Sequence, residues 1–254
     1  MVKNIDPMTY SNGDPRNFFV LNDKLYFFAA VNYVLRLFEY KGDYTFSNSS
    51  GDNSWTNPEN WNSKVLPAST DVSIIPAGSS PKITGNAYAR DLTISSPMNL
   101  SAGTLNISGN LDLGAKITLN NNNLNLKGNS SQITNANASN YIVTNGTGSV
   151  NVENLNSARG TVNLPIGTAT NYNPVSIANT GTSDTFSARV SDGISNTTNG
   201  AVNATWEISE ATAGGSNVSL TLGWNGSQPN SAFDSATANV GHYLTGNWTE
   251  ETSG

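Results

Sequence analysis

The side chains that could carry acid–base or nucleophilic chemistry are few in this sequence. It contains one histidine, His242, and no cysteine. A Ser-His-Asp hydrolase would have to use His242 as its base, with Ser191 and Asp192 as candidate partners. His242 lies in an alternating run that predicts a strand, and no Gly-x-Ser-x-Gly turn is present to hold a nucleophile. We therefore interpret His242 as structural.

Carboxylate pairs are the second chemistry to consider, because two Asp or Glu side chains can cleave a glycosidic bond. Such pairs could come from two acidic groups, namely Asp52, Glu59, Asp71 and Asp91, or Glu207 and Glu210. Each lies in a predicted turn or on a strand face, where a solvated surface role is ordinary. A polysaccharide lyase would also need a cation and a base. Only Lys116 and Lys127 offer such charge on the predicted β rungs.

Metal binding would have to rely on oxygen ligands. One histidine and no cysteine leave too few of the ligands that zinc prefers, whereas calcium needs only oxygen atoms. Turn residues offer such oxygens in two places, Asp52, Asn53, Asn57 and Glu59, and Asp192 with Asn196. No EF-hand spacing is present, and Asx residues in turns mostly bond their own backbone. Calcium is the one cofactor that the sequence leaves open.

Two tryptophans, Trp55 and Trp61, stand six positions apart in a segment that contains Pro58. Exposed side by side, their rings could form a platform on which a sugar stacks. The same spacing suits two rings that close the end of a β-solenoid. The first interpretation predicts a glycan-binding site at Trp55 and Trp61, and the second predicts a cap.

The elements that position these residues are predicted to be strands. Of 254 residues only 12% are charged, and Asn, Ser, Thr and Gly make up the difference. Five Trp, nine Tyr and eight Phe lie in short apolar alternations, so the chain should fold. The net charge is −6, without a basic cluster that could neutralise phosphates. Neither a nucleic-acid partner nor a membrane span is expected.

Three segments differ in pattern. Residues 1–43 read as a β-hairpin fragment with a further strand, too small to be stable alone. Residues 44–140 combine a Trp- and Pro-containing segment with Asn-rich rungs of a short β-solenoid. Residues 141–254 contain longer strands, which predict a β-sandwich that is truncated. The expected fold class is therefore all-β, a short solenoid followed by a sandwich, with the hairpin fragment at the N-terminus.

The solenoid is predicted from recurring apolar triplets, which begin at Leu92, Leu105, Leu111, Ile117 and Leu124. Asn or Gly residues separate them, as in stacked rungs. Parallel stacking would bury one face of each triplet and let Asn side chains form ladders at the corners. In the sandwich, strand alternation directs four aromatic residues inward, namely Phe186, Trp206, Trp224 and Tyr243.

Three stretches resemble parts of exported bacterial proteins. Residues 2–30, VKNIDPMTYSNGDPRNFFVLNDKLYFFAA, resemble the hyalin-like repeat of bacterial surface proteins. Residues 55–78, which contain WTNPENW and VLPASTDVSIIPAG, look like a Trp-x-x-Pro-x-x-Trp segment of Bacteroidota surface proteins. The stretch LPIGTATNYNPVSIANTGTSDTFSARV, with ATWEISEATAGGSNVSLTLGWN and VGHYLTGNW, is similar to the sandwich that precedes the sorting tail in type IX secretion cargo.

The resemblance implies an exported protein at the bacterial cell surface or released from it, and these families have no agreed molecular activity. A chain without cysteine fits export from a bacterium. The resemblance to Bacteroidota exported proteins also implies an O-linked glycan at Ser235, within Asp234-Ser235-Ala236. We expect a non-catalytic structural or adhesive module, with a carbohydrate-binding accessory domain of a polysaccharide-degrading protein as the alternative.

Assembly is a further expectation, because both ends of the chain look cut through β structure. Open strand edges could pair with other copies or with neighbouring domains of the same surface protein. Head-to-tail pairing of that kind would produce a filament. The competing interpretation places the missing strands in the same longer polypeptide.

Overall fold

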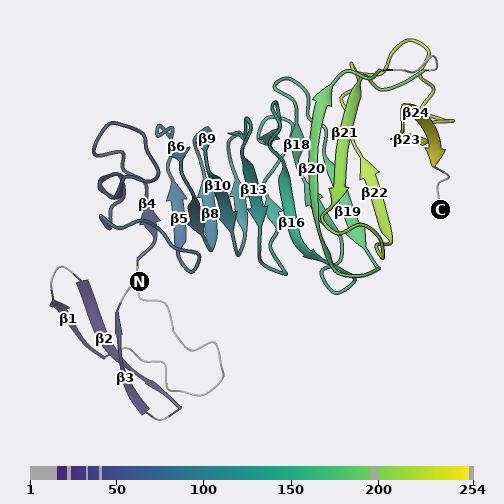
Figure 1. The fold of residues 1–254 in the computed structure, drawn as a ribbon. Coiled ribbons are helices and arrows are strands. Elements are labelled where there is room, and N and C mark those ends of the chain that lie inside the picture. The colour runs from purple at the N-terminus through teal and green to yellow at the C-terminus, as the bar shows by residue number, and fades with distance from the viewer. Residues whose placement is uncertain (1–15, 22–23, 33, 40–41, 196–199, 252–254) are drawn as a thin grey trace. The chain divides into compact units, whose positions relative to one another are not determined.

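The computed structural model describes residues 16–21, 24–32, 34–39, 42–195 and 200–251 (Figure 1). These residues form strands and one 3-10 helix, η1 (Pro58–Asn60). The all-β class is confirmed. The chain divides into an N-terminal unit, Met1–Asp43, and a main unit, Tyr44–Gly254. No described helix is long and apolar enough to cross a membrane.

The N-terminal unit contains a three-stranded antiparallel sheet with the order β1 (Arg16–Leu21), β2 (Lys24–Val31) and β3 (Val34–Glu39). Alternation along β2 buries Phe27 and Ala29 on one face. Phe27 stacks on Phe38 of β3 with ring centroids 5.6 Å apart. The predicted hairpin with one further strand is therefore present.

The main unit begins as a three-sided β-solenoid (Figure 1). Each turn contributes one strand to each of three walls, and the strands within a wall are parallel. The first wall contains β4 (Tyr44–Thr45), β5 (Val72–Ile75), β8 (Asp91–Ile94), β11 (Leu111–Leu113) and β14 (Ile133–Thr134). The second contains β6 (Lys82–Thr84), β9 (Met98–Ala102), β12 (Ile117–Thr118), β15 (Ile142–Val143) and β18 (Ile166–Gly167). The third begins with β7 (Ala87–Ala89), β10 (Thr104–Ile107), β13 (Asn123–Leu126) and β16 (Val150–Leu155).

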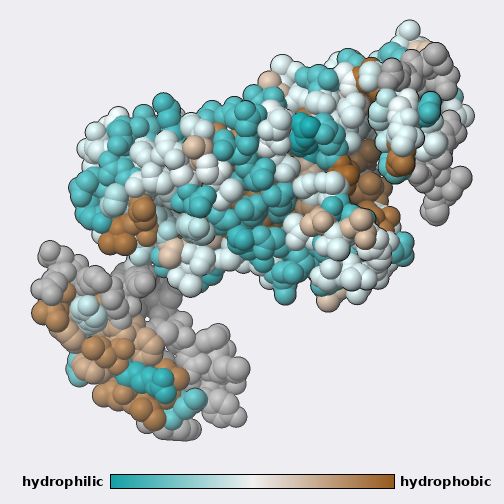
Figure 2. Space-filling view, viewed as in Figure 1, coloured by the Kyte–Doolittle hydropathy of each residue, from teal (hydrophilic) through white to brown (hydrophobic). Residues whose placement is uncertain are grey.

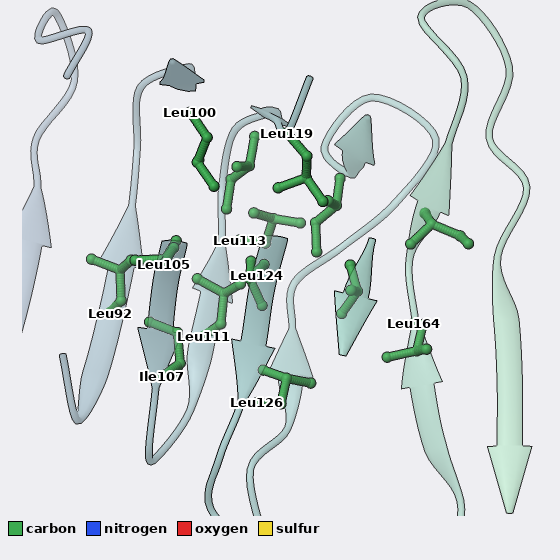
Figure 3. Packing of buried hydrophobic residues seen from close by; sticks show 14 of the residues in the cluster. Leu92, Leu100, Leu105, Ile107, Leu111, Leu113, Leu119, Leu124, Leu126 and Leu164 are labelled. Atoms are coloured by element: carbon green, nitrogen blue, oxygen red, sulfur yellow. The ribbon is translucent and has the colours of Figure 1, made fainter. Parts of the chain in front are cut away.

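The central turns repeat every 19 residues on all three walls. Leu92 pairs with Leu111, Met98 with Ile117, and Leu105 with Leu124. Inward-pointing side chains at matching positions of successive turns therefore stack on one another. Figure 3 shows the labelled side chains filling the interior of the solenoid. Leu105, Leu111 and Leu124 are fully buried, as period-two alternation on a wall with one face inward requires. The predicted solenoid is confirmed.

Asparagine makes the corner of the solenoid between β12 and β13. Asn120 takes a left-handed conformation with φ 53°, which Asn tolerates better than most residues. Its side-chain amide donates to the carbonyl of Leu100 on the preceding turn over 2.9 Å. The Asn-rich run after Ile117 therefore turns the chain and ties two turns together.

The sandwich grows out of the last solenoid strand. The third wall continues from β16 into the antiparallel strands β20 (Asp184–Asp192) and β21 (Ala204–Glu210). Opposite lies a three-stranded sheet with the order β17 (Val162–Leu164), β19 (Val175–Asn179) and β22 (Val218–Leu222). One buried cluster runs from Tyr44 to Ala204, so solenoid and sandwich share a core, and parallel pairing continues beyond residue 140.

The last two strands form a separate antiparallel hairpin, β23 (Val240–Leu244) and β24 (Asn247–Glu251). Thr245 and Gly246 both have positive φ, as a type I′ turn requires. The prediction of four inward aromatic residues is wrong for two of them. Tyr243 is 42% exposed in this hairpin, and Trp224, beyond the end of β22, is 39% exposed. Phe186 is buried, and Trp206 is half-buried against the core.

Candidate functional site

The loop between β4 and β5 closes the first turn of the solenoid with aromatic rings. Trp55 and Trp61 are 1% and 0% exposed. Their rings meet edge to face at 4.7 Å, and Phe46 packs edge to face on Trp61 at 5.4 Å. The Trp61 Nε1–H donates to the Trp55 carbonyl over 2.8 Å. We call Phe46, Trp55 and Trp61 the aromatic cap.

This burial corrects the prediction of a sugar platform at Trp55 and Trp61. A sugar stacks on an open ring face, and neither ring has one. The rings instead cover the apolar interior that the first turn would otherwise expose to water. The arrangement matches the alternative interpretation, in which the two tryptophans close the end of the solenoid.

Behind the cap, the carboxylate of Asp52 collects hydrogen bonds within the same loop. It accepts from the backbone N–H of Ser54 at 2.8 Å, from Asn57 Nδ2 at 2.8 Å and from Asn60 Nδ2 at 2.5 Å. Asn60 is fully buried, and its Oδ1 accepts from the backbone N–H and the hydroxyl of Ser50. Asn60 was not among the site residues predicted from the sequence, although its position beside Trp61 in an Asx-rich loop could have suggested it.

The predicted calcium ligands lie in this loop, but their oxygens already accept protein donors. Asn53 Oδ1 accepts from Asn48 Nδ2 at 2.8 Å, and Asn57 Oδ1 accepts from the N–H of Glu59 at 3.1 Å. Glu59 itself pairs with Lys64 at 3.0 Å. No group of three or more His, Cys, Asp or Glu that could hold a metal lies in the described parts of the chain. For the second candidate, Asp192 bonds Asn171 over 3.0 Å, and Asn196 lies outside the described residues.

We expect acid to lower the stability of this loop, because protonation of Asp52 weakens its hydrogen bonds. The Ser54 N–H, followed by Asn57 and Asn60, holds the pKa of this carboxyl well below its ordinary value. A lowered folded-state pKa stabilises the protein above the unfolded value of about 3.9, and this contribution is lost as pH falls. We expect Asp52→Asn to lower the melting temperature at pH 7, and the difference from wild type to shrink below about pH 4. Melting curves between pH 2 and 7 would test this.

The matched control for that experiment is Glu59→Gln in the same loop. Its exposed pair with Lys64 should contribute less than about 1 kcal/mol, so its melting temperature should follow wild type throughout. A pH-independent loss in Asp52→Asn would contradict the role of the Asp52 charge.

The remaining acid–base candidates are dispersed. Asp71 accepts the Ala68 N–H in a turn. Burial alone would raise the pKa of Asp91, but the Asn110 N–H and the bond and charge of Arg90 outweigh it and lower that pKa. Glu207 and Glu210 lie three positions apart on β21, so they point to opposite faces of the sheet.

The other three candidates also lie apart. Lys116 lies just before β12 on the second wall and donates to Tyr141 Oη over 3.0 Å, whereas Lys127, just after β13 of the third wall, pairs with Glu153 at 2.7 Å. His242 is exposed in the terminal hairpin.

A row of hydrogen-bonded asparagine side chains runs across the outer face of the third wall, whereas the sequence predicted Asn ladders only at the corners. Asn125 Nδ2 donates to Asn106 Oδ1 over 2.9 Å, and Asn151 Nδ2 donates to Asn125 Oδ1 over 2.8 Å. These residues are in register on β10, β13 and β16. We call Asn106, Asn125 and Asn151 the amide row. Its 19-residue spacing between Asn106 and Asn125 was visible in the sequence.

The amide row continues in both directions. Asn151 faces Ser187 on β20, and the hydroxyls of Ser187 and Ser209 on β21 bond at 2.7 Å. At the other end Tyr88 on β7 lies opposite Asn106 and is 40% exposed. One register line therefore crosses six strands and places an aromatic ring, three amides and two hydroxyls in a row on a single face.

The modification candidate Ser235 is accessible. It is exposed in a turn in which Asp234 Oδ1 accepts the Ala236 N–H at 2.9 Å. The Ser235 side chain therefore stands on the surface, where an enzyme could reach it.

Comparison with protein-family models, curated proteins and solved structures gave no match for this chain.

Proposed function

We propose that this chain is a non-catalytic structural or adhesive module of an exported bacterial protein, attached to the cell surface or released from it. The observation that carries the proposal is the outer face of the third wall, where Asn125 and Asn151 of the amide row are half-buried and present aligned hydrogen-bonding groups on a rigid support. Asn106, the third member, is buried and supports the row from beneath the surface. Support for export comes from the absence of cysteine and the low share of charged residues, together with the resemblance to Bacteroidota surface proteins and type IX secretion cargo.

Rigidity is what makes this face suitable for contact. Its side chains already bond one another, so little conformational entropy remains to be lost when a partner binds. Each Asn Nδ2 carries two N–H groups, and the bonds along the row use one of those on Asn125 and on Asn151. The second N–H of each half-buried amide can donate to a hydroxyl-rich polymer or to another surface.

Retention on polysaccharide tests the proposal. The full chain is mixed with insoluble cellulose, chitin and whole bacterial cells, and the protein left in solution is measured. We expect binding to at least one of them, and about tenfold weaker binding for Asn125→Ala/Asn151→Ala, since two aligned donors are lost. The matched control is Thr93→Ala/Thr134→Ala, which removes outward side chains from the first wall.

Two outcomes would count against the module. Equal binding by the row variant and the control would show that the third wall is not the contact face. New reducing ends or unsaturated sugars in the supernatant would indicate an enzyme.

A carbohydrate-binding accessory domain is the second candidate, and Tyr88 favours it. A half-exposed aromatic ring in the same row as the half-buried amides of Asn125 and Asn151 combines a stacking face with hydrogen-bonding groups, which together suit a sugar. If soluble oligosaccharides bind here, Tyr88→Ala should weaken binding about tenfold, whereas Tyr88→Phe should retain it because stacking does not need the hydroxyl. Titration calorimetry with both variants distinguishes a discrete sugar site from a general adhesive face.

A further inference from the structure

Strand β22 is the terminal strand of its sheet, and no strand in the part of the chain that the structure describes pairs with its outer edge. Its only strand neighbour among the described residues is β19. Gly223 N–H donates to the Pro174 carbonyl, and Thr180 N–H donates to the Asn217 carbonyl. Hydrogen-bonded pairs alternate along an antiparallel ladder, so the backbone groups of Val218, Leu220 and Leu222 point away from β19. These groups form a template for another strand.

The side chains on this edge are also incompletely covered. Leu220 pairs in register with the buried Ile177, so it points into the sandwich. Leu220 and Val218 are nevertheless each 37% exposed. Across the sandwich, Trp206 on β21 is only half-buried. Figure 2 shows apolar surface in the region of β21 and β22. The sandwich is therefore open along this side.

The sequence of β22 lacks the features that normally protect an edge. Exposed edges are usually short, or carry charges or proline. The other terminal strands in the described sheets of the main unit are either at most three residues long or contain a histidine or charged residue, as β21, β23 and β24 do. Strand β22 has five residues, Val-Ser-Leu-Thr-Leu, with neither charge nor proline.

We propose that β22 is a self-association edge whose occupant is β22 of a second copy, paired antiparallel about Leu220. A second copy fits because the strand is uncharged and is complementary to itself in this register. Leu220 would face its own counterpart and Val218 would face Leu222, which gives three hydrogen-bonded pairs with two bonds each. The same register places Ser219 opposite Thr221 on the outer face.

The symmetry of this pairing sets the size of the assembly. Both copies use the same edge, so the contact is isologous and closes at a dimer, not a filament. Five paired residues per copy give a contact at the small end of specific interfaces, so a dissociation constant of about 10–100 µM is expected. The inference rests on the proposed structural role, because a dimer would present two third walls to the same surface and raise avidity.

A charge exchange at Ser219 and Thr221 tests the proposal. Both side chains are exposed, so their replacement leaves the core intact. The Ser219→Lys/Thr221→Lys variant places like charges opposite each other and should weaken dimerisation at least tenfold. Ser219→Asp/Thr221→Asp should do the same. Mixing the two variants should restore a dimer that contains one copy of each, as sedimentation equilibrium would show.

The control variant, Ser157→Lys/Thr182→Lys, adds the same charge at exposed turns and should dimerise like wild type. Hydrogen exchange adds a second measurement, in which the amides of Val218, Leu220 and Leu222 become protected as wild-type concentration rises. Monomeric wild type at about 300 µM, above the expected dissociation constant, would overturn the proposal. Protection of these amides independent of concentration would show that the chain covers its own edge, and failure of the mixture to pair would show another partner strand.

Polysaccharide retention by the lysine variant separates this inference from the proposed function. Retention per molecule at concentrations below the dissociation constant depends on the third wall alone. Loss of the dimer with retained binding is expected. A wild-type chain that binds polysaccharide but never dimerises overturns the β22 proposal alone.

Discussion

Trp61→Ala should lower the free energy of unfolding of the main unit by about 3–5 kcal/mol. The side chain is fully buried, contacts Phe46 and Trp55, and donates its Nε1–H to the Trp55 carbonyl. Its removal leaves a cavity above the first solenoid turn and an unpaired carbonyl. Urea unfolding followed by far-UV circular dichroism would measure the loss without relying on tryptophan fluorescence.

Trp224→Ala is the matched control, because Trp224 is 39% exposed and contacts Phe233 at the surface. We expect it to cost about 1 kcal/mol or less. If both substitutions cost the same, the aromatic cap is not a principal support of the solenoid. If Trp61→Ala abolishes expression, Trp61→Phe should give a smaller, measurable loss.

Gly103→Ala should destabilise the main unit by about 3 kcal/mol, for two independent reasons. Gly103 has φ +79°, a conformation that L side chains rarely adopt. A Cβ there would also approach the Gly85 carbonyl carbon to 2.2 Å. These glycines occupy the same corner, between the second and third walls, on successive turns. The added methyl would push the two turns apart.

Gly226→Ala is the control for that substitution, since a Cβ at Gly226 meets no atom within 4 Å. It should leave the urea midpoint nearly unchanged. A Gly103→Ala variant as stable as Gly226→Ala would show that the corner relaxes, and that close stacking of the two turns is not required.

These two effects share a cause in the way a solenoid is built. Each turn buries its apolar residues only against the turns beside it. The first turn has no preceding neighbour in the main unit, so the aromatic cap covers its interior. Within the stack, turns can approach closely only where corner residues are small. The cap and the glycine corner therefore address the two requirements of a stacked fold, closed ends and close layers.

The rungs could be predicted from the sequence because their signal is local. Apolar triplets such as those at Leu92, Leu111 and Leu124 alternate with polar residues, and only the neighbouring rung is needed to bury them. The Asn-rich corner after Ile117 follows from the tolerance of asparagine for positive φ, which belongs to the residue itself. The rungs and the Asn-rich corner are both present in the structure, because the stacking of turns agrees with the local pattern of the sequence.

The amide row could be predicted only in part. The expectation that Asn side chains form ladders rested on composition, and Asn120 at a corner agrees with it. The row on the third wall also requires the register that aligns Asn106, Asn125 and Asn151. Its extension to Ser187 requires antiparallel pairing between strands far apart in the chain, which no local pattern contains.

The sequence alone determined the all-β class, the repeating apolar triplets, the turn residues and the absence of cysteine. Each of these is a property of a residue and its near neighbours. Only the tertiary structure decided which of these side chains are buried and which are exposed to water. It buried Trp55 and Trp61, left Trp224 and Tyr243 exposed, and used the oxygens around Asp52 for hydrogen bonds. Burial depends on what packs from elsewhere in the chain, and two rings with the same local pattern can therefore end on opposite sides of the surface.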